Sequence, residues 1–460
     1  MKYYPLTPVQ KVDLIQNLCV FLHPQSANIA ISVYLDKNID LDLLKKALDI
    51  EIERNDCLRL QFKMFGPFLR QYFVFEKHLD NIPFDDFSEK TEEDFIDYIK
   101  TQNSIPLRLL KGESYRLRFF RAPDGRFGIY GTFSHLVLDT IAIFIFYKDL
   151  LCVYKSLRDK TELPKPLYRY EDAMQKDFEI FRNKEKHRKN VEFYNDYFTR
   201  EKPSFFAGVD QMRDLKKTRK FFNSPDFRGA PIVHLFNDNS NTVKCHIDKE
   251  TIDEMVEFCR EKKISLQALF QLGIRTHLSK VNENADDVSF FITVGRRPTL
   301  ADQNSGGSRV LAHILRTDFG NETTFSDALS LMSIDNFKLF RHSDYSSIAE
   351  IIRMSVCDKR FVYFTAIPML FTFFPKEMFS IPEGVECEFF GLGTGHFVYS
   401  QYTMILPNLK DGGYDCYYEH QTRSITDDDV LLMHKNMEKA IKFGIKNPDL
   451  SIEHILNEVL

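Results

Sequence analysis

Residues 127–153 contain a strand pattern and a helix pattern that are joined by a short polar turn. From Phe127 to Phe133, apolar side chains recur at every second position, which is the period of a buried strand. From Ile141 to Val153, the apolar run has the length of a helix. The turn between these core elements holds His135 and Asp139, four residues apart. Two ionisable side chains in this position require either a structural or a chemical explanation.

Two structural explanations need no chemistry. His135 would be a core histidine that is hydrogen-bonded to the backbone. Asp139 would be the N-cap of the following helix, where an aspartate accepts hydrogen bonds from free N–H groups. Short motifs of this kind produce false positives, so the local pattern leaves the structural and the catalytic explanations open.

The length of the chain predicts two lobes. With 460 residues it exceeds what a single hydrophobic core usually holds, and its 43% of hydrophobic residues is sufficient for a sizeable core. Lys and Arg number 61 and Asp and Glu number 66, which gives a net charge of −5. This balance provides no general basic field, so we expect no nucleic-acid partner.

The N-terminus and the cysteines indicate the type of environment. The first ten residues, MKYYPLTPVQ, lack the basic segment and apolar run of a signal peptide. No stretch approaches the ~20 uninterrupted apolar residues of a membrane helix, so we expect a soluble cytoplasmic protein with no membrane partner. The eight cysteines are scattered without a CxxC or Cys/His spacing, which argues against zinc and against a disulfide framework. We therefore expect no bound metal.

Helix and strand signals are mixed within the first 160 residues. Thr7 and Gln10 form a capping-box pattern that begins the first helix. The segment 115–120 has a strand pattern, and a Pro-Asp-Gly turn predicts that it pairs with 127–133. We expect this part of the chain to form one sheet with its helices, and the second half repeats the mixed pattern.

Five segments, in order along the chain, resemble the condensation domain of non-ribosomal peptide synthetases, within the chloramphenicol-acetyltransferase-like acyltransferases. Single motifs of this length are weak signals, whereas five in the right order and spacing are a strong one. The segments are Leu6-Thr7 with Gln10, Arg54 to Phe62, Ser134 to Thr140, Val288 to Arg297 with Val310 to Arg316, and Tyr414 to Glu419 with Ile425-Thr426.

The resemblance implies an α/β fold with two chloramphenicol-acetyltransferase-like lobes of mixed sheets and helices. The lobes would form a V, with the active site in a tunnel between them. The N-terminal lobe would cover residues 1–176 and carry the active motif, and the C-terminal lobe would cover 177–460. From the sequence pattern itself, we expect one long charged helix over residues 170–198.

The resemblance also implies roles for individual residues. The family's His-His-x-x-x-Asp-Gly motif aligns with Ser134 to Thr140, and its second histidine, the functional one, is His135. Ser134 and Thr140 depart from the motif, and the branched Thr140 replaces a glycine that lets groups approach closely. Asp139 would be structural and would form an ion pair with an arginine of the other lobe, Arg297 or Arg296.

The implied reaction moves an acyl group from a thioester on a phosphopantetheine arm to an amine, forming an amide or less often an ester. His135 would act as a general base, through a neutral imidazole, or would position the amine. The chain would bind no cofactor itself, and its partners would be donor and acceptor carrier proteins and possibly adjacent synthetase modules. Two alternatives remain: a stand-alone acyl-coenzyme A-dependent acyltransferase, and a non-catalytic domain that recruits a carrier or a partner protein.

Overall fold

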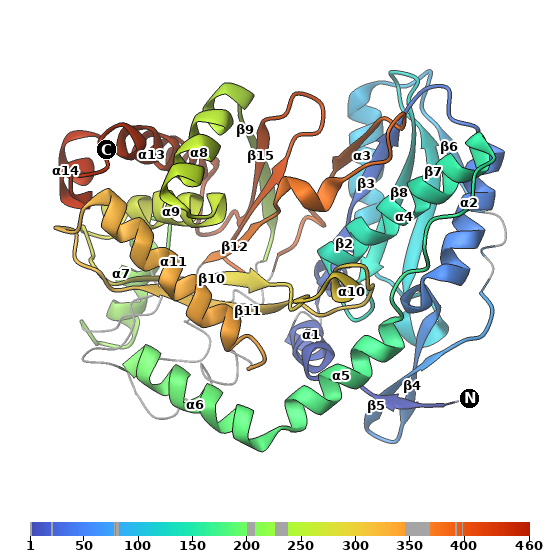
Figure 1. Ribbon diagram of the computed structural model, residues 1–460, viewed down its shortest axis with the longest axis horizontal. Coiled ribbons are helices and arrows are strands. Elements are labelled where there is room, and N and C mark those ends of the chain that lie inside the picture. The colour runs from blue at the N-terminus through green and yellow to red at the C-terminus, as the bar shows by residue number, and fades with distance from the viewer. Residues whose placement is uncertain are drawn as a thin grey trace. The chain divides into compact units, whose positions relative to one another are not determined.

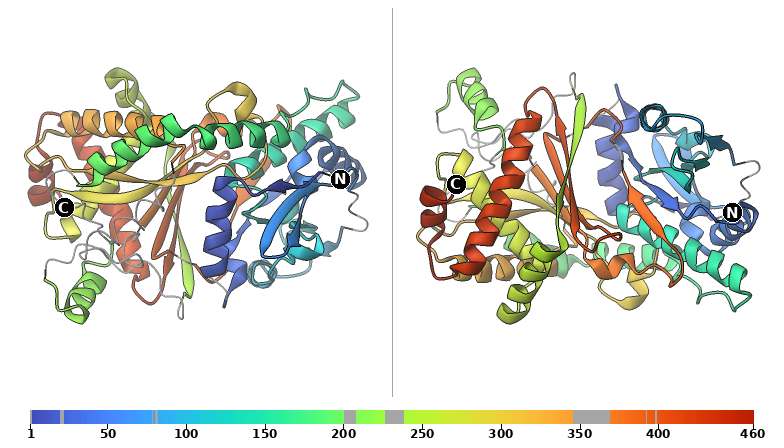
Figure 2. Two further views of the ribbon diagram at one scale, coloured as in Figure 1. Left: turned by 90° about the horizontal axis from the view of Figure 1, so that it is seen from below. Right: turned by 90° about the horizontal axis from the view of Figure 1, so that it is seen from above.

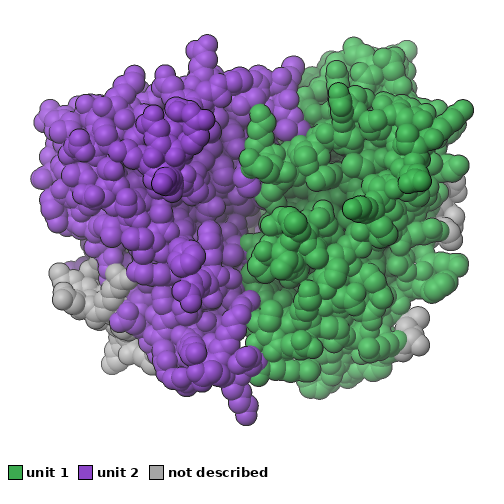
Figure 3. All heavy atoms as spheres, in the orientation of Figure 1, with its two compact units in different colours: residues 1–182, 295–310, 376–396 green, residues 183–294, 311–375, 397–460 purple. Residues whose placement is uncertain are grey.

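The computed structural model describes residues 2–19, 22–77, 79, 82–199, 208–225, 238–345, 369–391, 393–397 and 399–460. The chain forms two compact units, and each unit contains three separate stretches of sequence (Figure 3). Unit 1 comprises Met1–Arg182, Gly295–Val310 and Lys376–His396, and unit 2 comprises Asn183–Val294, Leu311–Pro375 and Phe397–Leu460.

This division differs from the single boundary expected after residue 176. Residues 295–310 and 376–396, which were expected in the C-terminal lobe, belong to unit 1. The single long helix expected near the boundary is wrong. It is two helices, α5 (Tyr170–Arg182) and α6 (Lys184–Thr199), and unit 2 begins at the break between them.

Unit 1 contains two sheets. The larger has the strand order β13-β3-β8-β7-β6, with β2 paired to one end of β8, and the smaller has the order β1-β5-β4. The expectation of one sheet therefore missed the smaller one. The strands are β1 (Tyr4–Pro5), β2 (Asn28–Ala30), β3 (Ser32–Leu35), β4 (Leu60–Phe65), β5 (Phe68–Phe73), β6 (Phe84–Asp86), β7 (Tyr115–Arg121), β8 (Phe127–Ser134) and β13 (Cys387–Phe390).

Helices cover both faces of the larger sheet of unit 1. Besides α5, the helices of unit 1 are α1 (Pro8–Cys19), α2 (Leu41–Arg54), α3 (Glu92–Asn103), α4 (Thr140–Asp159) and the short α10 (Leu300–Gln303). Single 3-10 turns are η1 (Pro24–Ala27), η2 (Asp56–Arg59), η3 (Leu109–Lys111) and η5 (Lys376–Phe379).

Strand β8 occupies the middle of this sheet, and its alternating side chains serve both faces. It pairs antiparallel with β7 in a register that places Tyr115 opposite Phe133, which confirms the predicted pairing. Tyr130 lies in the same core cluster as Phe95 of α3. Phe133 meets Phe146 of α4 edge-on, with the ring centroids 5.8 Å apart. Because successive strand residues point to opposite faces, one apolar strand holds both helical layers together.

Unit 2 is built on one six-stranded sheet with the order β11-β10-β12-β14-β15-β9. Pairs β10–β12 and β12–β14 are parallel, and the other neighbours are antiparallel. The strands are β9 (Ser240–Ile247), β10 (Val288–Val294), β11 (Leu311–Thr317), β12 (Met369–Phe373), β14 (Gln401–Pro407) and β15 (Tyr414–Gln421).

The helices of unit 2 share one hydrophobic core with its sheet. Figures 1 and 2 show these helices and strands as ribbons. With α6 they are α7 (Arg213–Phe221), α8 (Lys249–Lys262), α9 (Leu266–Val281), α11 (Phe325–Arg341), α13 (Asp427–Lys446) and α14 (Ile452–Glu458). Within the described ranges, every helix is too short or too polar to cross a bilayer.

Candidate functional site

The turn between β8 and α4 is held by its own backbone and by its apolar side chains. The carbonyl of Ser134 accepts from two N–H groups of the turn, at 2.9 and 3.1 Å. The three apolar residues that follow His135 are buried. Asp139 caps α4, since its Oδ1 accepts from the N–H of Ala142 at 2.8 Å. We call residues 135–139 the His135 turn.

Asp139 is buried at the centre of a dense polar network. Its carboxylate receives two hydrogen bonds from Arg297, Nη1 to Oδ2 at 2.9 Å and Nη2 to Oδ1 at 3.0 Å. Two backbone N–H groups, of Arg309 and Val310, also donate to Oδ2, at 2.8 and 3.1 Å. The bidentate geometry and the additional N–H donors compensate for removing both charges from water.

Of the two arginines proposed as partners of Asp139, Arg297 makes the contact. The guanidinium of Arg296 instead pairs with Asp177, at 2.9 and 3.3 Å. The arginine was expected to come from the other lobe, and this is wrong, because the segment 295–310 belongs to unit 1 as Asp139 does. The network is therefore internal to unit 1.

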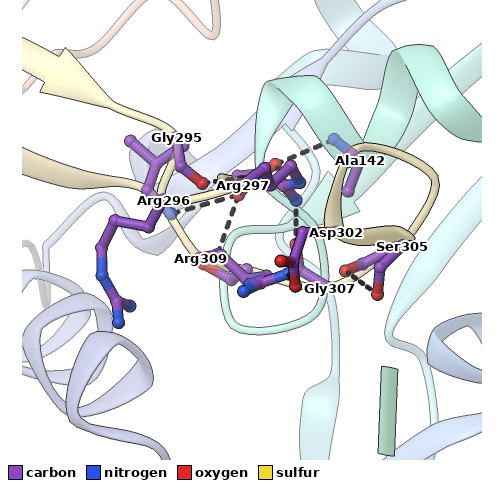
Figure 4. A network of polar contacts seen from close by, with 12 residues as sticks. Ala142, Gly295, Arg296, Arg297, Asp302, Ser305, Gly307 and Arg309 are labelled. Carbon is purple, nitrogen blue, oxygen red and sulfur yellow. Dashed lines mark hydrogen bonds and ion pairs between the residues drawn. The ribbon is translucent and has the colours of Figure 1, made fainter. Parts of the chain in front are cut away.

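The segment that carries Arg297 is itself fixed by polar contacts (Figure 4). Nη2 of Arg297 donates to the carbonyl of Gly307 at 3.0 Å. Gly307 has a φ of +86°, and a Cβ there would lie 2.0 Å from the ring of Tyr170, so only glycine fits. Arg309 pairs with Asp302 at 3.0 Å, and both side chains are buried. Arg297 is thus held on a rigid loop, which fixes the orientation of the guanidinium against its carboxylate partner.

His135 is partly accessible and faces a carboxylate. A third of its side chain is exposed, and its Nδ1 lies 3.5 Å from Oδ1 of Asp13, which is 6% exposed. Oγ of Ser308 also lies 3.5 Å from this Nδ1 and donates to Oδ2 of Asp13 at 2.9 Å. Burial lowers the pKa of His135, but the Asp13 carboxylate, the Asp139 carboxylate and a backbone hydrogen bond together outweigh this effect and raise the pKa to about 9. A raised pKa favours the protonated ring, which differs from the neutral imidazole that general-base catalysis requires.

Helix α1 supports the His135 turn through a second side chain. The Thr7–Gln10 capping box is present, and it confirms the predicted start of the helix. Nε2 of Gln10 also donates to the carbonyl of Leu136 at 2.9 Å. The amides of Gln10 and Gln71 bind each other at 2.7 and 2.8 Å. Because Gln10 and Asp13 are three residues apart, they lie on the same face of α1, and both reach the His135 turn.

The two departures from the motif occupy different environments. Ser134 is buried in the sheet, where its N–H donates to the carbonyl of Ser114 at 3.0 Å and its backbone pairs with Asn28. Thr140 is half-buried at the first position of α4. Its φ is not positive, so the backbone there does not require glycine, and the threonine changes only the space that its side chain fills.

Sequence reasoning missed Asp13 and Ser308. The available signal for Asp13 was a carboxylate one helical turn after Gln10, on a face that also carries the apolar Val9. Ser308 gave no local signal, because its contacts come from residues far away in the chain. Across the part of the chain that the structure describes, the residues of this site do not form a group suited to hold a metal ion.

The overall fold is that of solved condensation domains. The first condensation domain of the calcium-dependent antibiotic synthetase, solved with substrate analogue 2a, superposes with a TM-score of 0.80 over 99% of both chains, at 14% identity. VibH, an NRPS condensation enzyme, gives a TM-score of 0.73 over 98% of this chain and 99% of its own, at 15% identity. Likenesses at these identities show the fold.

The family follows from the sequence match. Residues 1–355 match the model of the condensation domain, and the chain belongs to this family. It is also 22% identical over 343 residues to surfactin synthase subunit 2 of Bacillus subtilis, a match that covers 74% of this chain and 9% of the relative. The chain thus spans a small part of the length of that synthetase. Condensation domains are acyltransferases that form amide bonds in non-ribosomal peptide synthesis.

Proposed function

We propose that this chain joins an acyl or peptidyl thioester on one carrier protein to the amine of an aminoacyl group on a second carrier, and that His135 acts at the reacting atoms. The observation that carries the proposal is the state of His135: it is one third exposed, on a turn whose last residue, Asp139, is locked by the buried pair with Arg297. Family membership supports the reaction class. Asp139 and Arg297 act structurally in this proposal.

The proposed step is a direct aminolysis of the thioester. The nitrogen of the neutral amine attacks the carbonyl carbon, the C–N bond forms, and the C–S bond breaks. The phosphopantetheine thiol leaves with the proton that the amine loses, so no oxidant or metal is required. A residue that transfers or shares this proton contributes ~10²–10⁴ in rate, and the positioning of two tethered substrates contributes at least as much.

The partners in this proposal are a donor and an acceptor carrier protein, each with its own phosphopantetheine arm. Family membership supports carrier-bound substrates, and the proposed reaction requires no cofactor bound by the chain itself. An acyl-coenzyme A donor is the alternative within the same fold. Competition between an acyl-loaded carrier and the same acyl-coenzyme A thioester decides between them, and incorporation from the carrier in preference to coenzyme A supports the proposal.

A substitution of His135 tests the proposal. Acyl-loaded and aminoacyl-loaded carriers are incubated with wild type and with His135→Ala, and the condensed product is measured by mass spectrometry of the acceptor arm. We expect the variant to lose ~10²–10⁴ in rate. His454→Ala, in unit 2, is the matched control and should retain the wild-type rate. Equal yields for His135→Ala and wild type remove His135 from the mechanism, and carrier binding by the wild type without product favours the non-catalytic alternative.

A further inference from the structure

The contact between Asp13 and His135 is a feature of this chain that the proposed reaction does not by itself require. We infer that Asp13 is a positioning residue, which turns Nδ1 of His135 toward α1 and keeps the ring protonated, so that His135 meets the substrate as a cation donating through Nε2. Ser308 holds the Asp13 carboxylate in place. The inference rests on the proposed function, since it assigns the form in which His135 acts.

The geometry places both polar neighbours on the same ring nitrogen. Asp13 Oδ1 and Ser308 Oγ each lie 3.5 Å from Nδ1 of His135, and Ser308 donates to the other carboxylate oxygen of Asp13 at 2.9 Å. In a Ser-His-Asp triad the serine and the aspartate must contact opposite nitrogens of the imidazole. This cluster is therefore not a nucleophile with its base, although it contains the same three residue types.

The charges around His135 favour its protonated form. The Asp139 carboxylate contributes to the raised pKa of His135, although it is paired with Arg297, and Asp302 is paired with Arg309. Asp13 is 6% exposed, and among the residues that the structure describes its ion-pair partner is His135. Burying a carboxylate is costly unless it is paired and hydrogen-bonded. The buried Asp13 carboxylate is therefore stabilised when the imidazole carries a proton and a positive charge.

Helix α1 gives the carboxylate a fixed position. One turn before Asp13, Gln10 donates to the carbonyl of Leu136, the residue next to His135. One face of α1 therefore contacts both the backbone of the turn, through Gln10, and the ring of His135, through Asp13. A ring with Nδ1 directed to α1 has Nε2 on its other side, because the two nitrogens are separated by one carbon of the ring.

The protonated ring has a defined part in the aminolysis. Negative charge develops on the thioester oxygen as the neutral amine attacks, and an imidazolium N–H stabilises such charge. When the C–S bond breaks, Nε2 gives its proton to the thiolate, and the ring regains a proton from the nitrogen of the new amide. The ring ends each cycle in its starting form. At neutral pH a fraction of an α-amine with a pKa near ~8 is already neutral, so the acceptor can attack without a base.

The test compares wild type with Asp13→Asn in the whole chain. Diethyl pyrocarbonate acylates neutral imidazole, so its rate of reaction at the peptide that contains His135, followed by mass spectrometry from pH 5.5 to 10, reports the titration of that ring. With a pKa of about 9 in the wild type, roughly 1% of the ring is neutral at pH 7. A return to the ordinary value of His in the variant makes most of the ring neutral, so we expect the modification rate to rise at least about 10-fold.

The rate of condensation gives the second readout. In the wild type we expect the rate, corrected for the ionisation of the amine, to fall as the pH rises through about 9. In Asp13→Asn this fall moves to about pH 6.5, so the variant is slower at pH 7. Asp42→Asn removes one carboxylate that is 94% exposed and should change neither readout.

Each result has one meaning. An unchanged titration of His135 in Asp13→Asn shows that Asp13 does not set its charge, and it overturns the inference. A shifted titration with a faster rate at pH 7 shows that His135 acts as a base, and it overturns the donor role. If the variant fails to fold, the wild type decides, because a titration midpoint near ~6.5, the ordinary value of His, overturns the inference. If the wild type forms no product, the proposed function fails, while the titration still decides the role of Asp13.

Discussion

At the scale of single residues, the motif residue Asp139 forms a buried ion pair with Arg297, and this pair stabilises the site. Both side chains are at most 4% exposed, and each holds a different segment of unit 1. Removing one partner leaves the other as an uncompensated buried charge, which typically costs about 3–5 kcal/mol. We expect Arg297→Ala to lower the free energy of unfolding by this amount, measured by urea denaturation.

The matched control is an exposed ion pair of the same unit. Asp97 and Lys100 are 68% and 62% exposed, and such pairs contribute about 0–1 kcal/mol. Asp97→Ala should therefore shift the urea midpoint far less than Arg297→Ala does. The double variant Asp139→Ala/Arg297→Ala should cost less than the sum of the single variants, because neither charge is then left alone. Equal costs for Asp97→Ala and Arg297→Ala would show that the buried pair does not stabilise the fold.

The sequence identified some of these contacts and could not identify others. The motif order predicted that Asp139 contacts Arg297 or Arg296, and the structure selects Arg297. Asp13 and Ser308 match no motif. Their role in the site follows only from their contacts with the ring of His135, which the folded structure creates. The charge on an imidazole depends on atoms that the fold brings together, so the motif identified the histidine but not its protonation state.

At the scale of elements, α1 connects the N-terminus to the His135 turn. Gln10 completes the helix cap and also binds the carbonyl of Leu136 and the amide of Gln71. Gln10→Ala leaves these buried groups unsatisfied, at about 1–3 kcal/mol for each group. We expect the variant to unfold at a lower urea concentration. We also expect its rate of condensation to fall about 10-fold or more, because a small displacement of the catalytic group lowers the rate strongly.

The variant Thr7→Ala distinguishes the two roles of Gln10, which are to complete the cap of α1 and to support the His135 turn. It removes the hydroxyl that accepts from the N–H of Gln10 but leaves the Gln10 side chain in contact with Leu136. The loss of such a cap costs about 1 kcal/mol. We expect a lower stability at nearly unchanged kcat/KM. If Thr7→Ala reduces kcat/KM as much as Gln10→Ala does, the contact to the turn is not what couples α1 to activity.

Most elements were predictable because their apolar periods are strong, and the exception has a local cause. The pattern of residues 170–198 continues across Asn183 without a change in polarity, so it predicted one helix. In the structure, the side chain of Asn183 accepts from the N–H of Lys186 at 2.9 Å and begins α6. Asparagine is a favourable N-cap, but inside a charged run this signal is hidden by residues that suit a helix equally well.

At the scale of the whole molecule, unit 1 is completed by two stretches from the second half of the chain. Residues 387–390 form β13, which pairs antiparallel with β3 and is itself the edge strand of the larger sheet. Phe389 and Phe390 of this strand pack on Phe144 and Tyr34, with ring centroids 5.2 and 4.4 Å apart. The segment 295–310 supplies Arg297. No local sequence pattern indicates that segments so far apart along the chain contact each other. The sequence therefore predicted a continuous N-terminal lobe.

Because unit 1 is assembled from three stretches of sequence, we predict that the first stretch, residues 1–182, cannot fold alone. A chain of residues 1–182 lacks β13, so the edge of β3 is left open, and it lacks Arg297, so the buried carboxylate of Asp139 is left unpaired. We expect it to show no cooperative thermal unfolding and no near-ultraviolet circular dichroism, and to bind a dye specific for exposed apolar surface. Co-expression with residues 183–460, which carry both missing stretches, should restore a soluble complex with the unfolding transition of the intact chain. A cooperative transition for residues 1–182 alone would show that unit 1 is complete without the returning segments.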